Sequence, residues 1–101
     1  MDSLYFGTAR PGGEVSSEDW RQFLAAVVTP RFPDGLTSWS AAGQWRTASG
    51  DLQRESSYVL YIVHPDGERD DRAIAEVVRL YKARFEQQAV LRVRTPACVS
   101  F

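Results

Sequence analysis

Apolar residues recur at two different spacings along the chain, and the spacing separates predicted helices from predicted strands. From Ser16 to Pro30 the large apolar side chains stand at i, i+3, i+4 and i+7, on one face of a helix: Trp20, Phe23, Leu24 and Val27. Two serines followed by two acids are typical of a helix start. Pro30 is expected to end this helix, because proline disfavours helical backbone at the preceding residue.

A second helix is predicted after the turn at 64–67, with Asp70 and Asp71 near its start, and Gln87–Gln88 is expected to close it. Its acidic residues come first and its basic residues last, as the helix dipole favours. Its apolar residues again repeat at helical spacing: Ile74, Val77, Val78, Tyr81 and Phe85.

Four other segments are rich in aromatic and β-branched residues and are predicted to be strands: residues 4–6, 36–46, 58–63 and 90–94. The run 58–63 is apolar almost throughout, which favours a central strand covered on both faces. A bulge is expected at Ala42–Gly43. The Arg-Pro-Gly-Gly run at 10–13 is expected to be a loop, and the apolar tail 97–101 to dock on the domain.

The resulting order is β-α-β-β-α-β within 101 residues, which is one domain. Right-handed crossovers leave one common arrangement for this order. The prediction is an α+β, ferredoxin-like sandwich with a four-stranded antiparallel sheet and two helices on one face.

Alternation along the strands divides the sheet residues between a helix-covered face and an open face. We expect these to face the helices: Leu4, Phe6, Leu60, Ile62, Leu91 and Val93. We expect these on the open face: Tyr5, Val59, Tyr61, Val63, Val90, Arg92 and Arg94. An open face that is this apolar should be covered. A homodimer, a small-molecule cavity beneath a partner and, less favoured, an RNA surface are the alternatives.

The charge balance and the composition exclude some classes of binding partner and indicate a compartment. Lys and Arg total 12 against 13 Asp and Glu, so a nucleic-acid partner is not expected. No apolar run is long enough to cross a membrane. The single cysteine, Cys98, permits no internal disulfide and is expected to be a packed thiol in a reducing, cytoplasmic setting. Export or lipid anchoring is the alternative if an N-terminal signal has been removed.

His64 is the only histidine and follows the central strand. It is the candidate catalytic acid or base at the mouth of a cavity, although a solvated turn residue is the interpretation that we favour. No set of residues has metal-ligand spacing, so neither a metal nor another cofactor is expected.

Polar and aromatic residues around the two central strands are the candidates for ligand binding. Arg54 and Glu55 should point to opposite faces, and Arg54 could stack on Trp45 across the hairpin. Tyrosine hydroxyls on the open face could orient a small ligand. The candidate ligand-binding residues are Tyr5, Trp45, Arg54, Glu55, Tyr61, His64 and Arg92.

Several short runs, taken together, resemble one family over nearly the whole chain. The most specific is Thr-Pro-Arg-Phe-Pro-Asp-Gly, and others are Tyr-Phe-Gly at 5–7, Gly-Gln-Trp-Arg at 43–46 and Cys-Val-Ser-Phe at 98–101. The chain resembles the bacterial domain-of-unknown-function family 3574. The resemblance implies kinship and no activity, and its members often look exported or lipid-anchored.

Three functions remain open from the sequence. The first is a self-associating module that binds a small molecule or acts as an accessory domain. The second is a cofactor-independent enzyme of the dimeric ferredoxin-like type, such as a small oxygenase or isomerase, with His64, Arg54 and Tyr61 lining its cavity. The third is a purely structural interaction protein.

Overall fold

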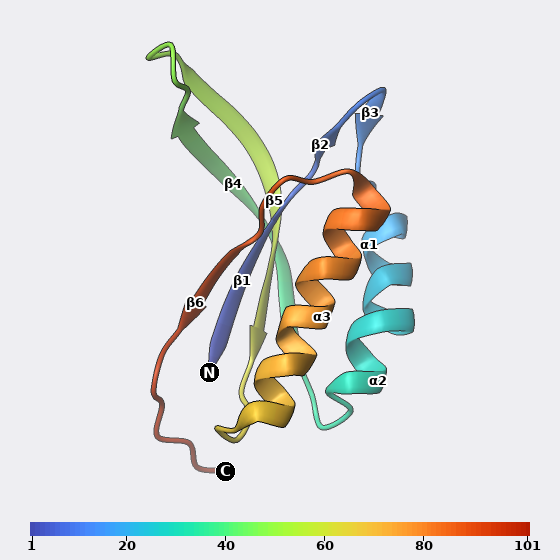
Figure 1. The fold of residues 1–101 in the computed structure, drawn as a ribbon, viewed down its shortest axis with the longest axis vertical. Helices are drawn as coiled ribbons and strands as arrows, with labels where there is room; N and C mark the ends of the chain where they lie inside the picture. The colour runs from blue at the N-terminus through green and yellow to red at the C-terminus, as the bar shows by residue number, and fades with distance from the viewer.

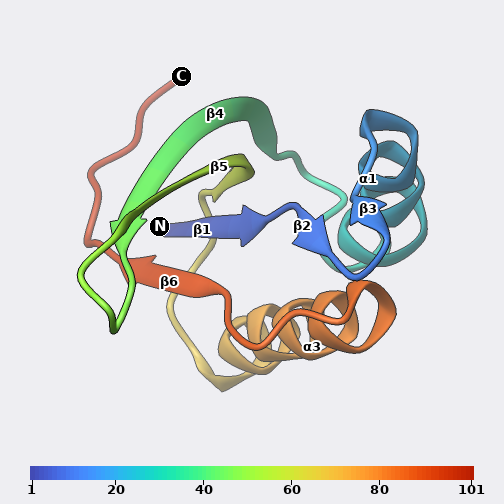
Figure 2. The same cartoon turned by 90° about the horizontal axis from the view of Figure 1, so that it is seen from above.

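A computed structural model describes all of residues 1–101 as a two-layer α+β sandwich. Figure 1 and Figure 2 show the helices on one side of a curved four-stranded sheet. The predicted ferredoxin-like arrangement is confirmed. The strands are β1 (Asp2–Gly7), β2 (Ala9–Arg10), β3 (Gly13–Glu14), β4 (Thr37–Arg46), β5 (Leu52–Ile62) and β6 (Leu91–Arg94). The helical elements are α1 (Ser17–Phe23), η1 (Leu24–Val28), α2 (Thr29–Arg31) and α3 (Glu68–Phe85).

The main sheet has the order β4-β5-β1-β6, and every neighbouring pair is antiparallel. The β4–β5 hairpin pairs residue for residue from Thr37 opposite Tyr61 to Arg46 opposite Leu52. The bulge predicted at Ala42–Gly43 is therefore wrong, because the two strands keep one register over their whole length. The outer half of this hairpin extends past the helices (Figure 1).

The first helical segment begins as the sequence predicts. Ser16 accepts a hydrogen bond from the Asp19 amide, and the Asp19 carboxylate accepts one from the Ser16 amide, which forms a capping box. The end of the segment differs. The five-residue π-helical segment η1 follows α1, and Pro30 lies in the first turn of α2, so helical structure continues to Arg31.

An aromatic core lies between the sheet and the helices. Trp20 of α1 stacks on Tyr58 of β5 with ring centroids 4.9 Å apart, and Phe6 meets Tyr81 of α3 at 4.6 Å. The polar ends of these rings are satisfied. Trp20 Nε1 donates to Ser38, the Tyr58 hydroxyl to a backbone carbonyl, and the Tyr81 hydroxyl to the Gly7 carbonyl at 2.6 Å.

The opposite face of the sheet carries exposed apolar side chains. The predicted division of strand residues between the helix-covered face and the open face is confirmed for β1 and β5, where Leu4, Phe6, Leu60 and Ile62 join the core. It is wrong for β6 and the residue before it. Leu91 pairs with Tyr5 and Val93 with Ser3, on the open face. Arg92 and Arg94 lie on the helix side, and Val90 packs against the core.

Two further predictions are corrected at the ends of elements. Residues 10–13 belong to a small second hairpin, β2–β3, and not to a simple loop. The tail 97–101 is exposed and has no regular structure, so neither the docked tail nor the packed Cys98 thiol is correct. The reason is that β1 begins at Asp2, opposite Arg94, so the tail runs past the start of its neighbouring strand.

No helix in the chain has both the length and the apolar character that crossing a membrane requires.

Candidate functional site

The largest cavity is an open cleft of about 800 Å³ on the uncovered face of the sheet. β1, β4 and β5 supply most of its lining, and the segment after α3 closes one side. Its side chains combine apolar walls with hydrogen-bonding groups, including Tyr5, Trp45, Glu55, Ser57, Gln87 and Leu91.

Glu55 is held in place by the backbone that follows β1. Its Oε1 accepts hydrogen bonds from the amides of Thr8 and Ala9, each at 3.0 Å. Thr8 is itself buried, and its hydroxyl binds the backbone carbonyl and the hydroxyl of Ser56. The carboxylate therefore has a fixed position, although it lies on the exposed outer part of the hairpin.

Gly7 makes this close approach feasible. A Cβ atom at this position would lie 2.8 Å from Glu55 Oε1 and 3.1 Å from Gln87 Oε1. Gln87 donates its amide group to the carbonyls of Ala9 and Phe85, so it too is fixed. The missing side chain thus lets an acid from β5 and an amide from beyond α3 converge beside β1.

An aromatic group continues from the cleft across the open face. Tyr61 meets Trp39 edge to face, with ring centroids 4.6 Å apart. Tyr5 lies diagonally across from Tyr61 on the paired strands. The adjacent Tyr61 phenol and partial desolvation raise the pKa of Tyr5, so the Tyr5 hydroxyl is a neutral donor at physiological pH.

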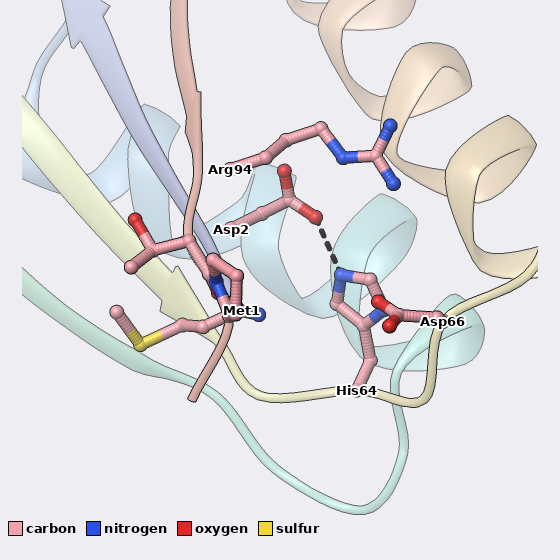
Figure 3. A pocket seen from close by; sticks show the side chains of 7 residues that line it. Met1, Asp2, His64, Asp66 and Arg94 are labelled. Carbon is pink, nitrogen blue, oxygen red and sulfur yellow. Dashed lines mark hydrogen bonds and ion pairs between the residues drawn. The ribbon is translucent and has the colours of Figure 1, made fainter. Parts of the chain in front are cut away.

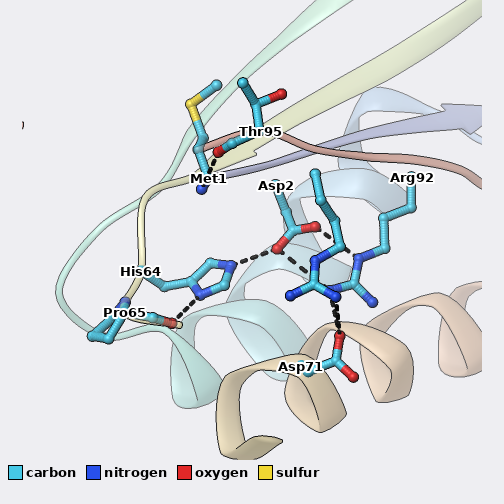
Figure 4. A network of polar contacts seen from close by, with 8 residues as sticks. Met1, Asp2, His64, Pro65, Asp71, Arg92 and Thr95 are labelled. Atoms are coloured by element: carbon cyan, nitrogen blue, oxygen red, sulfur yellow. Dashed lines mark hydrogen bonds and ion pairs between the residues drawn. The ribbon is translucent and has the colours of Figure 1, made fainter. Parts of the chain in front are cut away.

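A second polar cluster lies beneath the other end of the sheet (Figure 4). Asp2 is 1% exposed and accepts from Arg92 Nε at 2.7 Å and from His64 Nε2 at 2.5 Å. Arg92 also donates to Asp71 of α3 at 2.8 Å. Burial by itself would raise the pKa of Asp2, but the hydrogen bonds and charges of Arg92 and His64 outweigh it and lower that pKa.

His64 is engaged at both ring nitrogens. Nε2 contacts the Asp2 carboxylate and Nδ1 contacts the Pro65 carbonyl at 2.7 Å. Both ring nitrogens therefore have a hydrogen-bond partner within the chain. The side chain is only 6% exposed, which makes the expectation of a solvated turn residue wrong.

A small polar cavity of about 140 Å³ adjoins this cluster, with Asp66 and Arg94 at its border (Figure 3). It is far smaller than the cleft. Neither nitrogen of His64 is free there to take a proton from a ligand, so the geometry favours a structural role for the pair. No group of three or more His, Cys, Asp or Glu side chains is placed to hold a metal ion.

The structure brings together only part of the predicted site. Tyr5, Trp45 and Glu55 line the cleft, and Tyr61 lies on the same face of the sheet. His64 and Arg92 belong to the Asp2 cluster on the helix side. Arg54 points to the face opposite Trp45, which is paired with Gln53, so the proposed Trp45–Arg54 stacking is wrong.

Four residues of these two clusters were not singled out from the sequence: Gly7, Gln87, Asp2 and Asp71. The sequence does carry a signal for Asp2. This residue lies two residues before Leu4 and four before Phe6, so strand alternation places its carboxylate on the same buried face, where it needs a partner. Gly7 and Gln87 carry no such signal, because their roles arise only from tertiary contacts.

The chain belongs to the family described as "Protein of unknown function (DUF3574)", which matches residues 1–101. No curated protein matches the chain. Among solved structures, the chain is similar to a phage SAM lyase in complex with S-methyl-5′-thioadenosine, with a TM-score of 0.68 and 16% identity. That match covers 90% of this chain and 76% of the lyase.

The apo state of a phage SAM lyase is similar to the same extent, with a TM-score of 0.66 and 13% identity. This match covers 90% of this chain and 74% of that one. At such identities the likeness is one of fold.

Proposed function

We propose that this chain is a self-associating domain that binds a small molecule in the cleft formed by β1, β4, β5 and the segment after α3. The observation that carries the proposal is the cleft itself. Its volume of about 800 Å³ lies within the range of small-molecule sites. Its aromatic walls and its few fixed polar groups are the combination by which such sites bind and orient a ligand.

The solved relatives support a ligand with a flat ring system. A phage SAM lyase of this fold holds S-methyl-5′-thioadenosine. In the present chain, Trp45 is 54% exposed and offers a free aromatic surface beside the cleft. An adenine ring could stack there while its ribose hydroxyls meet Ser57 or Glu55.

A second copy of the chain is the proposed cover of the open face. Trp39, Leu91 and Val93 are all exposed on this face, next to the cleft. Contiguous apolar surface of this kind is typical of an interface. The net charge of −1 gives two copies little mutual repulsion. A partner sheet would roof the cleft and exclude water from the ligand.

Tryptophan fluorescence tests the ligand site directly. We expect titration with S-methyl-5′-thioadenosine to quench the emission saturably, because a stacked adenine would contact the exposed indole of Trp45. Trp45→Phe should abolish most of the change. Trp39→Phe is the matched control, since Trp39 lies outside the cleft lining and its loss should leave the titration intact.

The absence of saturable quenching, together with unchanged amide chemical shifts for the cleft residues at millimolar nucleoside, would refute binding of this ligand class. Quenching that persists in Trp45→Phe and disappears in Trp39→Phe would move the ligand away from the cleft.

A further inference from the structure

The cleft has a pronounced imbalance of charge. Two carboxylates, Glu55 and Glu86, are among its lining residues, whereas no lysine, arginine or histidine is. From this imbalance we infer that the cleft selects organic cations: molecules whose flat or apolar body bears a sulfonium or ammonium centre. The inference rests on the proposed function and names the chemical class that the site prefers.

Glu55 has an oxygen available for such a ligand. Both of its hydrogen bonds from Thr8 and Ala9 end on Oε1, and Oε2 accepts none. The two backbone amides fix the position of the side chain and, being uncharged, leave the negative charge of the carboxylate available to a ligand. A ligand can therefore approach a carboxylate whose ordering cost has already been met by the fold.

Gln87 adds a second acceptor. Its Nε2 is used by the carbonyls of Ala9 and Phe85. Its Oε1 lies beside Gly7, as does Oε1 of Glu55, since both are near the position that a Cβ would take there. The wall beside Gly7 thus presents oxygen acceptors, which suit a cation or a hydrogen-bond donor.

The neighbouring cations of the chain are used elsewhere. Arg10 lies over the ring of Phe85 and pairs with Asp19 at 3.6 Å. Arg46 donates to the Gly50 carbonyl at the hairpin turn, and Arg54 points to the opposite face. Glu55 forms no ion pair with any of them, so its charge is not neutralised within the fold.

The aromatic walls act in the same direction. Trp45 has no aromatic partner within the chain, and its indole is half exposed beside the acid. A cation that approaches an indole face is attracted by the ring quadrupole. A fixed carboxylate beside an unpaired indole is a common way to recognise a methylated sulfonium or ammonium group.

The decisive experiment compares two ligands that differ by one methyl group and one positive charge. S-methyl-5′-thioadenosine is the neutral thioether, and 5′-deoxy-5′-(dimethylsulfonio)adenosine is its sulfonium. In calorimetric titrations of the full chain at neutral pH and low salt, we expect the sulfonium to bind about tenfold more tightly. The preference should shrink as salt is added.

Glu55→Gln separates charge from architecture, because the amide oxygen can still accept from Thr8 and Ala9. This variant should keep the thioether affinity within about threefold and lose most of the preference for the sulfonium. Glu68→Gln removes the same charge at the far end of α3 and is the matched control. It should leave both affinities unchanged.

The outcomes are distinguishable. If both ligands bind equally well, the inference of charge selection is overturned and the small-molecule site stands. If the sulfonium preference survives Glu55→Gln, the assigned role of Glu55 is wrong. If neither ligand binds, the proposed function fails, and the inference fails with it.

Discussion

At the scale of single residues, Asp2 has an unusual position. It is almost fully buried at the start of β1, yet it carries charge, and the cost of burying that charge is offset by Arg92 and His64. These two partners come from the opposite end of the chain and from the end of β5. Asp2 thus ties the first strand to the last and to the central hairpin.

Replacing Asp2 by Asn should lower the free energy of unfolding by about 3 kcal/mol at neutral pH, because it removes the buried carboxylate that the side chains of Arg92 and His64 both contact. The pKa of Asp2 is lowered in the folded state from its ordinary value of 3.8. Its contribution is therefore complete above that value and is lost as the pH falls through the lower folded pKa.

Urea denaturation of the wild-type protein and of Asp2→Asn from pH 2 to pH 7 measures how the contribution of Asp2 to the free energy of unfolding depends on pH. The gap in stability between them should be constant above about pH 5 and should close in the most acidic samples. Asp66→Asn is the control, since Asp66 borders the same small cavity without forming a hydrogen bond to Asp2 or His64. A gap that widens with acid would contradict the assignment.

At the scale of elements, the first helical segment changes its winding along its length. It begins with a capping box at Ser16, passes through the π-helical segment η1 and ends in the short α2. η1 contains only aliphatic side chains, and its buried residue Val28 joins the core. The side-chain hydrogen bonds of the capping box between Ser16 and Asp19 fix this segment at its start.

Ser16→Ala should lower the free energy of unfolding by about 1 kcal/mol, because the Asp19 amide loses its side-chain acceptor. Thermal unfolding followed by circular dichroism gives the measurement. Ser17→Ala is the matched control, since its hydroxyl forms no hydrogen bond in the structure and its loss should cost only a few tenths of a kcal/mol. Equal losses for the two serines would contradict the capping assignment.

Most elements could be predicted from the sequence, because apolar periodicity over six or more residues identifies a helix face or a buried strand. The orientation of β6 could not. Its four residues alternate apolar and charged side chains, so either face is plausible from the pattern alone. The choice is made by the Arg92–Asp2 contact, whose partners lie 90 residues apart.

The candidate site shows the same limit. Tyr5, Trp45 and Glu55 stood out because aromatic and charged residues on strands need a surface or a partner. The grouping of His64 with Arg54 and Tyr61 did not hold. Tyr61 lies on the open face and His64 on the helix side, because a difference of one position in a strand sends a side chain to the other face. Arg54 is separated from His64 by the length of β5, since it lies near the exposed start of the strand and His64 follows its buried end.

At the scale of the whole molecule, the exposed apolar side chains are unevenly distributed. Trp39, Trp45, Leu91 and Val93 all belong to the open face, while the helix side of the sheet is filled by the aromatic core. A chain of 11.4 kDa has little interior with which to compensate for such a surface. This asymmetry is the basis of the proposed self-association.

Light scattering after size-exclusion chromatography should therefore give a mass of at least twice 11.4 kDa at micromolar concentration. Val93→Arg should return the protein to a monomer, because it places a charge within the apolar face, on its edge strand β6. Leu52→Arg is the control, since Leu52 is equally exposed but lies on the other face of the hairpin. A wild-type monomer at high concentration would exclude the dimer.

The extension of the β4–β5 hairpin past the helices has a consequence for local stability. Tyr58, Leu60 and Ile62 of β5 are buried in the core, whereas residues 52–54 are exposed. Only one end of the hairpin is packed against the core, so the free energy needed to open its backbone hydrogen bonds falls toward the tip. The cleft is built on this less stable half. Amide protons near Glu55 should exchange with solvent sooner than those near Leu60, and a bound ligand should slow only the former.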